Sequence, residues 1–155
     1  ALTPVPLTAG QHLTWGEVSA EVLWPPPGVP EQVGANDASV VLAATVAGVD
    51  LLLTGDIEPT AARGVRRQVV DRTFDIVKVP HHGSAAQDPE LLSRSGAVVA
   101  LIGVGADNTF GHPTPTALRL LAEAGTLVLR TDRHGDVAVV VDGKRLGAVT
   151  ERGDG

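Results

Sequence analysis

The sequence predicts a mixed α/β fold, a layered α/β or α+β arrangement, in a single domain of residues 1–155. About the first 54 residues hold four β-rich apolar runs and no helical pattern, and the rest alternates apolar runs with helix-forming segments. Strands followed by strand–helix units are typical of one or two sheets covered by helices. Hydrophobic residues make up 43% of the chain and charged residues 19%, as in folded globular proteins rather than disordered ones.

The first four runs predict two hairpins. Residues 11–24 turn at Gly16 and Glu17, and the runs 39–47 and 49–54 are joined at Gly48. Between the two hairpins, residues 25–37 open with three prolines and a glycine, which forbid regular structure, so we expect a loop there.

The remaining segments predict helices and strands in alternation. Proline at the first helical position starts two helices, one from Pro59 to about Arg72 and one from Pro115 to near Gly125. A shorter helix is capped by Asp88 and ends at Gly96. The expected strands are 74–79, 97–104, 126–130 and 136–141, with a turn at 133–135 and a frayed tail at 151–155.

Composition limits the chemistry of the chain. Cysteine is absent, so there is no disulfide or thiolate metal site, and any metal must be held by His, Asp, Glu or Asn. A formal net charge of −6 argues against a broad basic surface that grips nucleic acid by itself, although a metal-dependent phosphodiesterase can be acidic. The chain has no Met, begins at Ala and shows neither a membrane span nor a signal peptide, so we expect a segment of a longer protein.

Two apolar runs end in metal-ligand chemistry. Residues 51–53 lead into Thr54-Gly55-Asp56, where Asp56 is either an ordinary turn residue or a metal-bridging carboxylate. The next strand leads into Pro80-His81-His82-Gly83-Ser84, and adjacent histidines in such a turn favour a metal-ligand or acid–base role.

Further polar clusters have two interpretations each. In residues 108–113, His112 either orients the substrate or donates a proton to a leaving oxygen, or else it caps the following helix. Residues 36–39 form an ordinary Asx or Ser turn, or place Asn36 or Ser39 at the border of the site. We interpret Thr131 and Asp132 as structural.

Surface roles are expected for several remaining charged residues. His12 and His134 are predicted to be solvated. The arginines of the first helix form a basic face that is either solvated or in contact with a phosphate: Arg63, Arg66 and Arg67.

With these motifs in place, the chain resembles the C-terminal metallo-β-lactamase-like domain of the DNA-internalisation competence protein family (ComEC). The match runs from Asn36 to about Gly143 on five motifs in order: Asn-x-x-Ser-Val-Val-Leu (36–42), Leu-Leu-Thr-Gly-Asp (52–56), Val-Pro-His-His-Gly-Ser (79–84), Phe-Gly-His-Pro (110–113) and Arg-Thr-Asp-x-x-Gly (130–135).

The resemblance implies the C-terminal half of a metallo-β-lactamase αββα sandwich, with one or two metal ions at the sheet edge. Asp56 is then the bridging carboxylate, and His81, preferred to His82, is the ligand of the second metal. His112 lies near the substrate phosphate, and the expected substrate-binding residues are Ser84, Asn108, Asn36 and Ser39.

One departure from the family pattern is decisive. The principal ligand motif of the superfamily, His-x-His-x-Asp-His, occurs nowhere in this chain. The resemblance therefore implies that a divalent metal, Zn²⁺ or Mn²⁺, binds weakly here through Asp56 and His81. It also implies an exposed apolar sheet face and an isolated chain with little or no activity.

The resemblance implies that the parent protein is a metal-dependent nuclease domain, which in that family degrades the non-transforming DNA strand during uptake. Hydrolysis of small esters or phosphodiesters, and a non-catalytic module that guides DNA to a membrane channel, are the alternatives. The implied partners are single-stranded DNA, the N-terminal half of the sandwich and a membrane channel domain of the same parent chain. The implied location is a soluble domain on the extracytoplasmic face of the plasma membrane.

Overall fold

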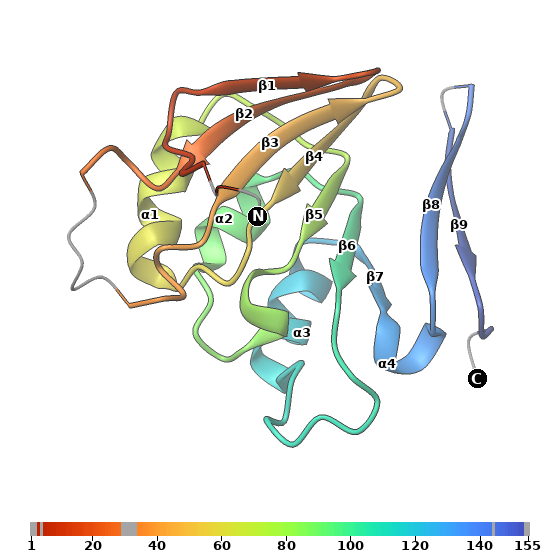
Figure 1. The fold of residues 1–155 in the computed structure, drawn as a ribbon. Helices are drawn as coiled ribbons and strands as arrows, with labels where there is room; N and C mark the ends of the chain where they lie inside the picture. The colour runs from red at the N-terminus through yellow and green to blue at the C-terminus, as the bar shows by residue number, and fades with distance from the viewer. Residues whose placement is uncertain (1–2, 4, 29–33, 144, 154–155) are drawn as a thin grey trace.

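A seven-stranded mixed sheet forms the centre of the computed structural model, which describes residues 3, 5–28, 34–143 and 145–153 (Figure 1). The strands lie in sequence order, with β1 to β4 antiparallel and β4 to β7 parallel. Their bounds are β1 His12–Trp15, β2 Val18–Trp24, β3 Val41–Val46, β4 Val49–Leu53, β5 Ile76–Lys78, β6 Val99–Ile102 and β7 Leu127–Arg130. Both predicted hairpins and the mixed α/β class are confirmed.

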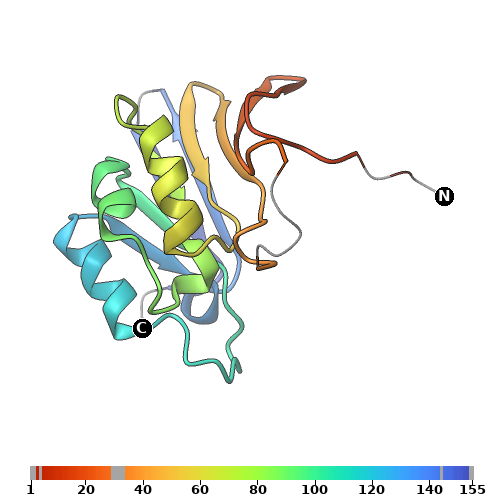
Figure 2. The same cartoon turned by 90° about the vertical axis from the view of Figure 1, so that its left-hand side faces the viewer.

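Helices α1 (Pro59–Gln68), α2 (Pro89–Arg94) and α3 (Pro115–Glu123) connect the parallel strands and cover one face of the sheet (Figure 2). Each begins with a proline in its first turn, as predicted. Helix α1 ends at Gln68, before the expected Arg72, because Val69 leaves the helical region at a φ of −109°. None of the helices in the described residues is long and apolar enough to cross a membrane.

The main core lies between these helices and the sheet. It is built almost entirely from aliphatic side chains and contains one buried phenylalanine, Phe74. Members from the sheet include Leu23, Leu52 and Val77, and Leu121 contributes from α3. Removing this apolar area from water is the main stabilising term for the fold.

The C-terminal residues form a second layer on the other face of the sheet (Figures 1 and 2). A helical turn, α4 (Thr131–His134), stands where we expected a simple turn, and it leads into a separate antiparallel hairpin of β8 (Val137–Asp142) and β9 (Arg145–Thr150). Strand β9 was not predicted. Its own residues, which include Gly147, lack a clear alternation of apolar and polar side chains, so the sequence contains no strand signal there. The segment is a strand because it pairs with β8 through backbone hydrogen bonds.

Two expectations for the C-terminal part are corrected by this layer. His134 is not a solvated residue: it is 7% exposed, and its Nδ1 accepts a hydrogen bond of 2.8 Å from the backbone N–H of Arg130. The tail does not fray at Glu151, whose N–H donates to the carbonyl of Asp136. Residues 154 and 155 of that tail, and residues 29–33 of the predicted loop, lie outside the described part of the chain.

The hairpin covers part of the apolar face that we expected to be open. Val139 and Leu146 pack against a small cluster of buried strand residues that includes Ile76 and Val99. A cavity of about 340 Å³ remains between β8 and the sheet, with Leu51 and Leu101 in its wall.

Candidate functional site

Polar side chains from three loops gather at one edge of the sheet. Strand β4 leads into Asp56, β5 leads into His81 and His82, and the loop after β6 carries His112. Because β4, β5 and β6 are parallel, their carboxyl ends meet at the same edge. The ring centroids of His81 and His112 are 5.6 Å apart, and those of His81 and His82 are 6.4 Å apart.

The two adjacent histidines lie in a strained backbone turn. His81 has a φ of 47° and His82 a φ of 53°, both in the left-handed region that non-glycine residues rarely adopt. Such conformations cost about 1–3 kcal/mol each and persist only where the surroundings impose them. The turn directs the imidazole of His81 toward Glu58 and that of His82 toward Asp56.

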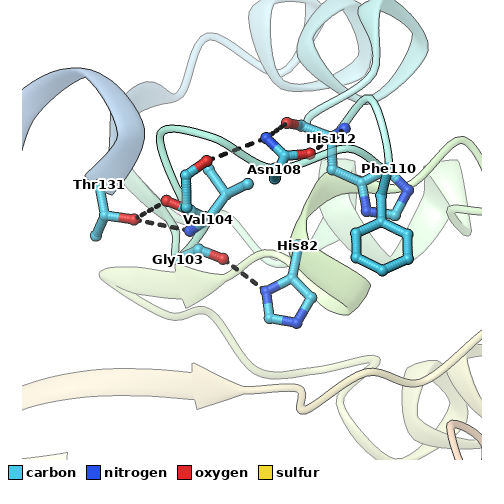
Figure 3. Close-up of a pocket in the computed structure, with 8 residues that line it drawn as sticks. His82, Gly103, Val104, Asn108, Phe110, His112 and Thr131 are labelled. Carbon is cyan, nitrogen blue, oxygen red and sulfur yellow. Dashed lines mark hydrogen bonds between the residues drawn. The ribbon is translucent and has the colours of Figure 1, made fainter.

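Asp56 faces His82, not His81. The distance from Asp56 Oδ2 to His82 Nε2 is 3.4 Å. On the other side of the ring, His82 Nδ1 lies 2.6 Å from the carbonyl oxygen of Gly103 and donates its hydrogen to it (Figure 3). In a neutral His82 the Nε2 lone pair therefore points at a carboxylate, and a cation between the two atoms relieves their repulsion.

His81 is directed to a second carboxylate, Glu58, which the sequence analysis did not select. The distance from His81 Nδ1 to Glu58 Oε1 is 3.7 Å, and this nitrogen is buried with no hydrogen-bond partner among the described residues. A buried polar atom of this kind calls for a ligand or a specific role. Partial burial lowers the pKa of the neighbouring His112, and the imidazoles of His81 and His82 lower it further.

Lys78 is a second member of the site, after Glu58, that the sequence analysis missed. Its Nζ donates to the carbonyl of Gly55 at 2.7 Å and lies 3.4 Å from Asp56 Oδ1. One oxygen of Asp56 thus faces an ammonium group and the other faces His82. The sequence did contain a signal for Lys78, because a charged residue in an otherwise apolar strand needs a polar partner nearby.

The residues after the long loop hold the Asp56 turn in place. Ser39 Oγ accepts a hydrogen bond of 3.1 Å from the backbone N–H of Asp56, and Asn36 Nδ2 donates to Glu58 Oε1 at 3.0 Å. A Cβ atom on Gly55 would lie 2.7 Å from Ser39 Cβ. Gly55 is therefore required for close packing against Ser39, and Asn36 and Ser39 border the site by supporting its carboxylates.

The other two expected substrate-binding residues have partners inside their own loops. Ser84 is 5% exposed, its Oγ lies 3.5 Å from Gln87 Nε2, and its carbonyl oxygen accepts a hydrogen bond from the same nitrogen at 3.1 Å. Asn108 Nδ2 donates to the carbonyls of Gly105 and His112, and its Oδ1 accepts from the N–H of His112. Both side chains shape the site from within, and their contact with substrate stays a prediction.

The positions of Asp56 and His82 fit those of two ligands in a metal site. A tetrahedral ion with bonds of about 2.0–2.1 Å holds neighbouring ligand atoms roughly 3.4 Å apart, and Asp56 Oδ2 and His82 Nε2 have this separation. The described residues contain no group of three or more His, Asp or Glu side chains placed to hold a metal. The described part of the chain thus offers a pair of ligands and not a complete set.

The fold, a large mixed sheet with helices on one face, is similar to that of a solved structure. A solved structure from Parabacteroides distasonis ATCC 8503, described as a putative metal-dependent hydrolase, matches with a TM-score of 0.50 over 81% of this chain and 56% of that one, at 16% identity. At this identity the likeness shows the fold alone.

One curated protein is similar in sequence. ComE operon protein 3 of Bacillus subtilis (strain 168) is 32% identical over 112 residues, which cover 72% of this chain. The chain spans 14% of the length of that protein. No protein-family model matches the chain.

Proposed function

We propose that the chain is part of a metal-dependent hydrolase domain that cleaves phosphodiester bonds of DNA during competence uptake. The observation that carries the proposal is the pairing of Asp56 Oδ2 with His82 Nε2 at 3.4 Å, at the ends of adjacent parallel strands. The similarity to ComE operon protein 3 and the hydrolase-like fold support the same class of activity.

In this proposal Asp56 and His82 would hold the ion, and His81 lies beside them, directed toward Glu58. A divalent cation bound there would supply positive charge to the phosphodiester and acidify water. Lys78 keeps the carboxylate of Asp56 oriented through its second oxygen. His112, beside His81, stabilises or protonates the leaving oxygen.

The lack of a complete ligand set among the described residues supports a partner segment that supplies the other ligands. The remaining ligands come from the N-terminal half of the sandwich, single-stranded DNA is the substrate, and a membrane channel domain of the same parent chain delivers the strand on the extracytoplasmic face. The cavity beside β8 is apolar and offers a surface for the missing half. The chain by itself is expected to be inactive or nearly so.

Metal titration of the chain tests the ligand pair. We expect weak binding of Mn²⁺ or Zn²⁺ by calorimetry, and its loss in Asp56→Asn and in His82→Ala. His12→Ala, which removes an exposed imidazole from β1, separated from β4 by β2 and β3, is the control and should bind as the native chain does. Native-like affinity in both site variants would refute the assignment of Asp56 and His82.

Activity is tested in the full-length protein. We expect metal-dependent cleavage of single-stranded DNA and a loss of roughly 100-fold or more in Asp56→Asn. Cleavage of a small ester without cleavage of DNA would favour the small-substrate alternative. If the full-length protein neither binds metal nor cleaves DNA or the ester, the non-catalytic module would be favoured.

A further inference from the structure

A cavity of about 410 Å³ lies next to the carboxylate–histidine pairs, on the far side of His82 from Asp56. The loop after β6 forms much of its wall, and α4 contributes Thr131. His82 belongs to both places: its Nδ1 is bonded to the cavity wall at Gly103, and its Nε2 faces Asp56. A molecule held in this cavity would therefore be adjacent to the proposed site of phosphodiester cleavage.

An aromatic ring stands at this cavity almost entirely in solvent. Phe110 is 83% exposed, and its ring centroid is 6.2 Å from that of His112, with the two planes tilted by 30° (Figure 3). The chain has two phenylalanines, and the other, Phe74, is buried in the core. A single exposed apolar residue is common on protein surfaces, so a functional role for Phe110 has to be argued from the residues around it.

Three polar side chains of the cavity wall, Thr131, Asn108 and His82, already have hydrogen-bond partners within the wall. Thr131 Oγ1 donates to the carbonyl of Val104 and accepts from its N–H, both at 2.7 Å. The amide of Asn108 is bonded to Gly105 and His112, and His82 Nδ1 is bonded to Gly103. The wall therefore presents ring faces and apolar atoms to a ligand, with little capacity to read its hydrogen-bonding pattern.

Electrostatic attraction is a weak means of binding nucleic acid here. The chain has a formal net charge of −6, and the site contains Asp56 and Glu58. The ammonium of Lys78 is already paired with Asp56. A nucleic acid strand would need a contact other than its phosphates, and stacking of a base on an aromatic face is such a contact.

We propose that Phe110 is a stacking platform for a base of single-stranded nucleic acid, and that it holds the strand beside Asp56 and His82 without reading its sequence. The inference rests on the proposed function for the identity of the substrate. Stacking on Phe110 would make the site selective for single strands, because the bases of a duplex are stacked on each other and do not offer a free face.

Binding of short oligonucleotides by the chain in EDTA tests this inference without any metal or cleavage. The probes are fluorescein-labelled dT12, dA12, an abasic 12-mer with the same number of phosphates, and a 12-base-pair duplex, followed by anisotropy. We expect dT12 and dA12 to bind within a few-fold of each other and more tightly than the abasic strand or the duplex. Phe110→Ala should weaken binding of dT12 roughly 5- to 150-fold, the range for one stacked base, and Phe110→Trp should retain it.

Trp15→Ala is the matched control, since it removes a 52% exposed aromatic from β1, away from the cavity. Its affinity for dT12 should equal that of the native chain. Equal binding of dT12 by Phe110→Ala and the native chain, equal binding of the abasic strand and dT12, or no measurable binding of dT12 at all would each overturn the inference. If stacking is observed while Asp56→Asn has no effect on metal binding or cleavage, the inference stands and the proposed function fails.

Discussion

At the scale of single residues, the site depends on backbone conformations that only a few positions can adopt. His81 and His82 occupy the left-handed region in succession, and this places one imidazole toward Glu58 and the other toward Asp56. Gly55, in the turn after the adjacent strand β4, is also at positive φ and lies close to Ser39. Strain of this kind is retained where geometry matters more than stability.

Gly55→Ala should destabilise the chain more than Gly16→Ala does. The two glycines have nearly the same φ, +57° and +58°, but a Cβ on Gly55 would be 2.7 Å from Ser39 Cβ, whereas nothing lies within 4 Å at Gly16. The left-handed conformation costs an alanine about 1–2 kcal/mol at either position, and overpacking adds about 1–3 kcal/mol at Gly55 alone. Urea unfolding measures both, and equal losses would show that Ser39 moves aside without cost.

At the scale of elements, the junction of β7 with α4 is fixed by one ion pair. Arg130 Nε donates to Asp132 Oδ1 at 3.0 Å, Nη2 donates to Oδ2 at 2.5 Å, and both side chains are largely buried. The hydrogen bonds from Arg130 hold the pKa of Asp132 below its ordinary value of 3.8, although burial acts in the opposite direction. Because α4 carries Thr131 into the cavity wall, this junction also affects the pocket beside His82.

Asp132→Asn should reduce the dependence of the unfolding free energy on pH in the acid range. A carboxylate with a lowered pKa in the folded state stabilises the fold at pH values above its unfolded pKa, and this contribution is lost as the pH falls below about 4 toward the folded pKa. We expect the variant to lose about 1–3 kcal/mol at pH 7 and to show a shallower decline in unfolding free energy between about pH 5 and pH 2. Asp71→Asn, which makes the same charge change at an exposed position, is the control. A native slope in Asp132→Asn would contradict the assignment.

At the scale of the whole molecule, the sheet lies between unequal layers. Helices α1, α2 and α3 cover one face, and the hairpin of β8 and β9 covers part of the other (Figure 2). A two-stranded hairpin is at best marginally stable by itself in water. Because Val139 and Leu146 pack against apolar strand residues of the sheet, we infer that this packing holds the hairpin in position.

Val139→Ser should destabilise the chain by about 1 kcal/mol, because Val139 packs against the sheet and is partly buried. Val149→Ser makes the same change on β9 at a mostly exposed position and should cost less than about 0.5 kcal/mol. Thermal unfolding gives the two losses, and binding of a dye specific for apolar surface should rise in Val139→Ser only. Equal effects in the two variants would show that the hairpin is not held by this packing.

The sequence by itself determined the class of fold and most of the elements. Glycine turns, proline helix starts and apolar runs are local signals, and they were sufficient for both hairpins and the three larger helices. The same local order placed Asp56, His81 and His112 after strands, so their convergence followed once the strands were parallel.

Only the tertiary structure decided which groups meet. Lys78, the last residue of β5, meets Asp56, and Glu58, the N-cap of α1, meets His81. Two residues in the left-handed region direct His82, rather than His81, toward Asp56. His134 is buried in α4, which leads into a hairpin with an unpredicted strand. These outcomes depend on contacts between residues far apart in the chain, and the sequence pattern around each residue carries no information about its distant partner.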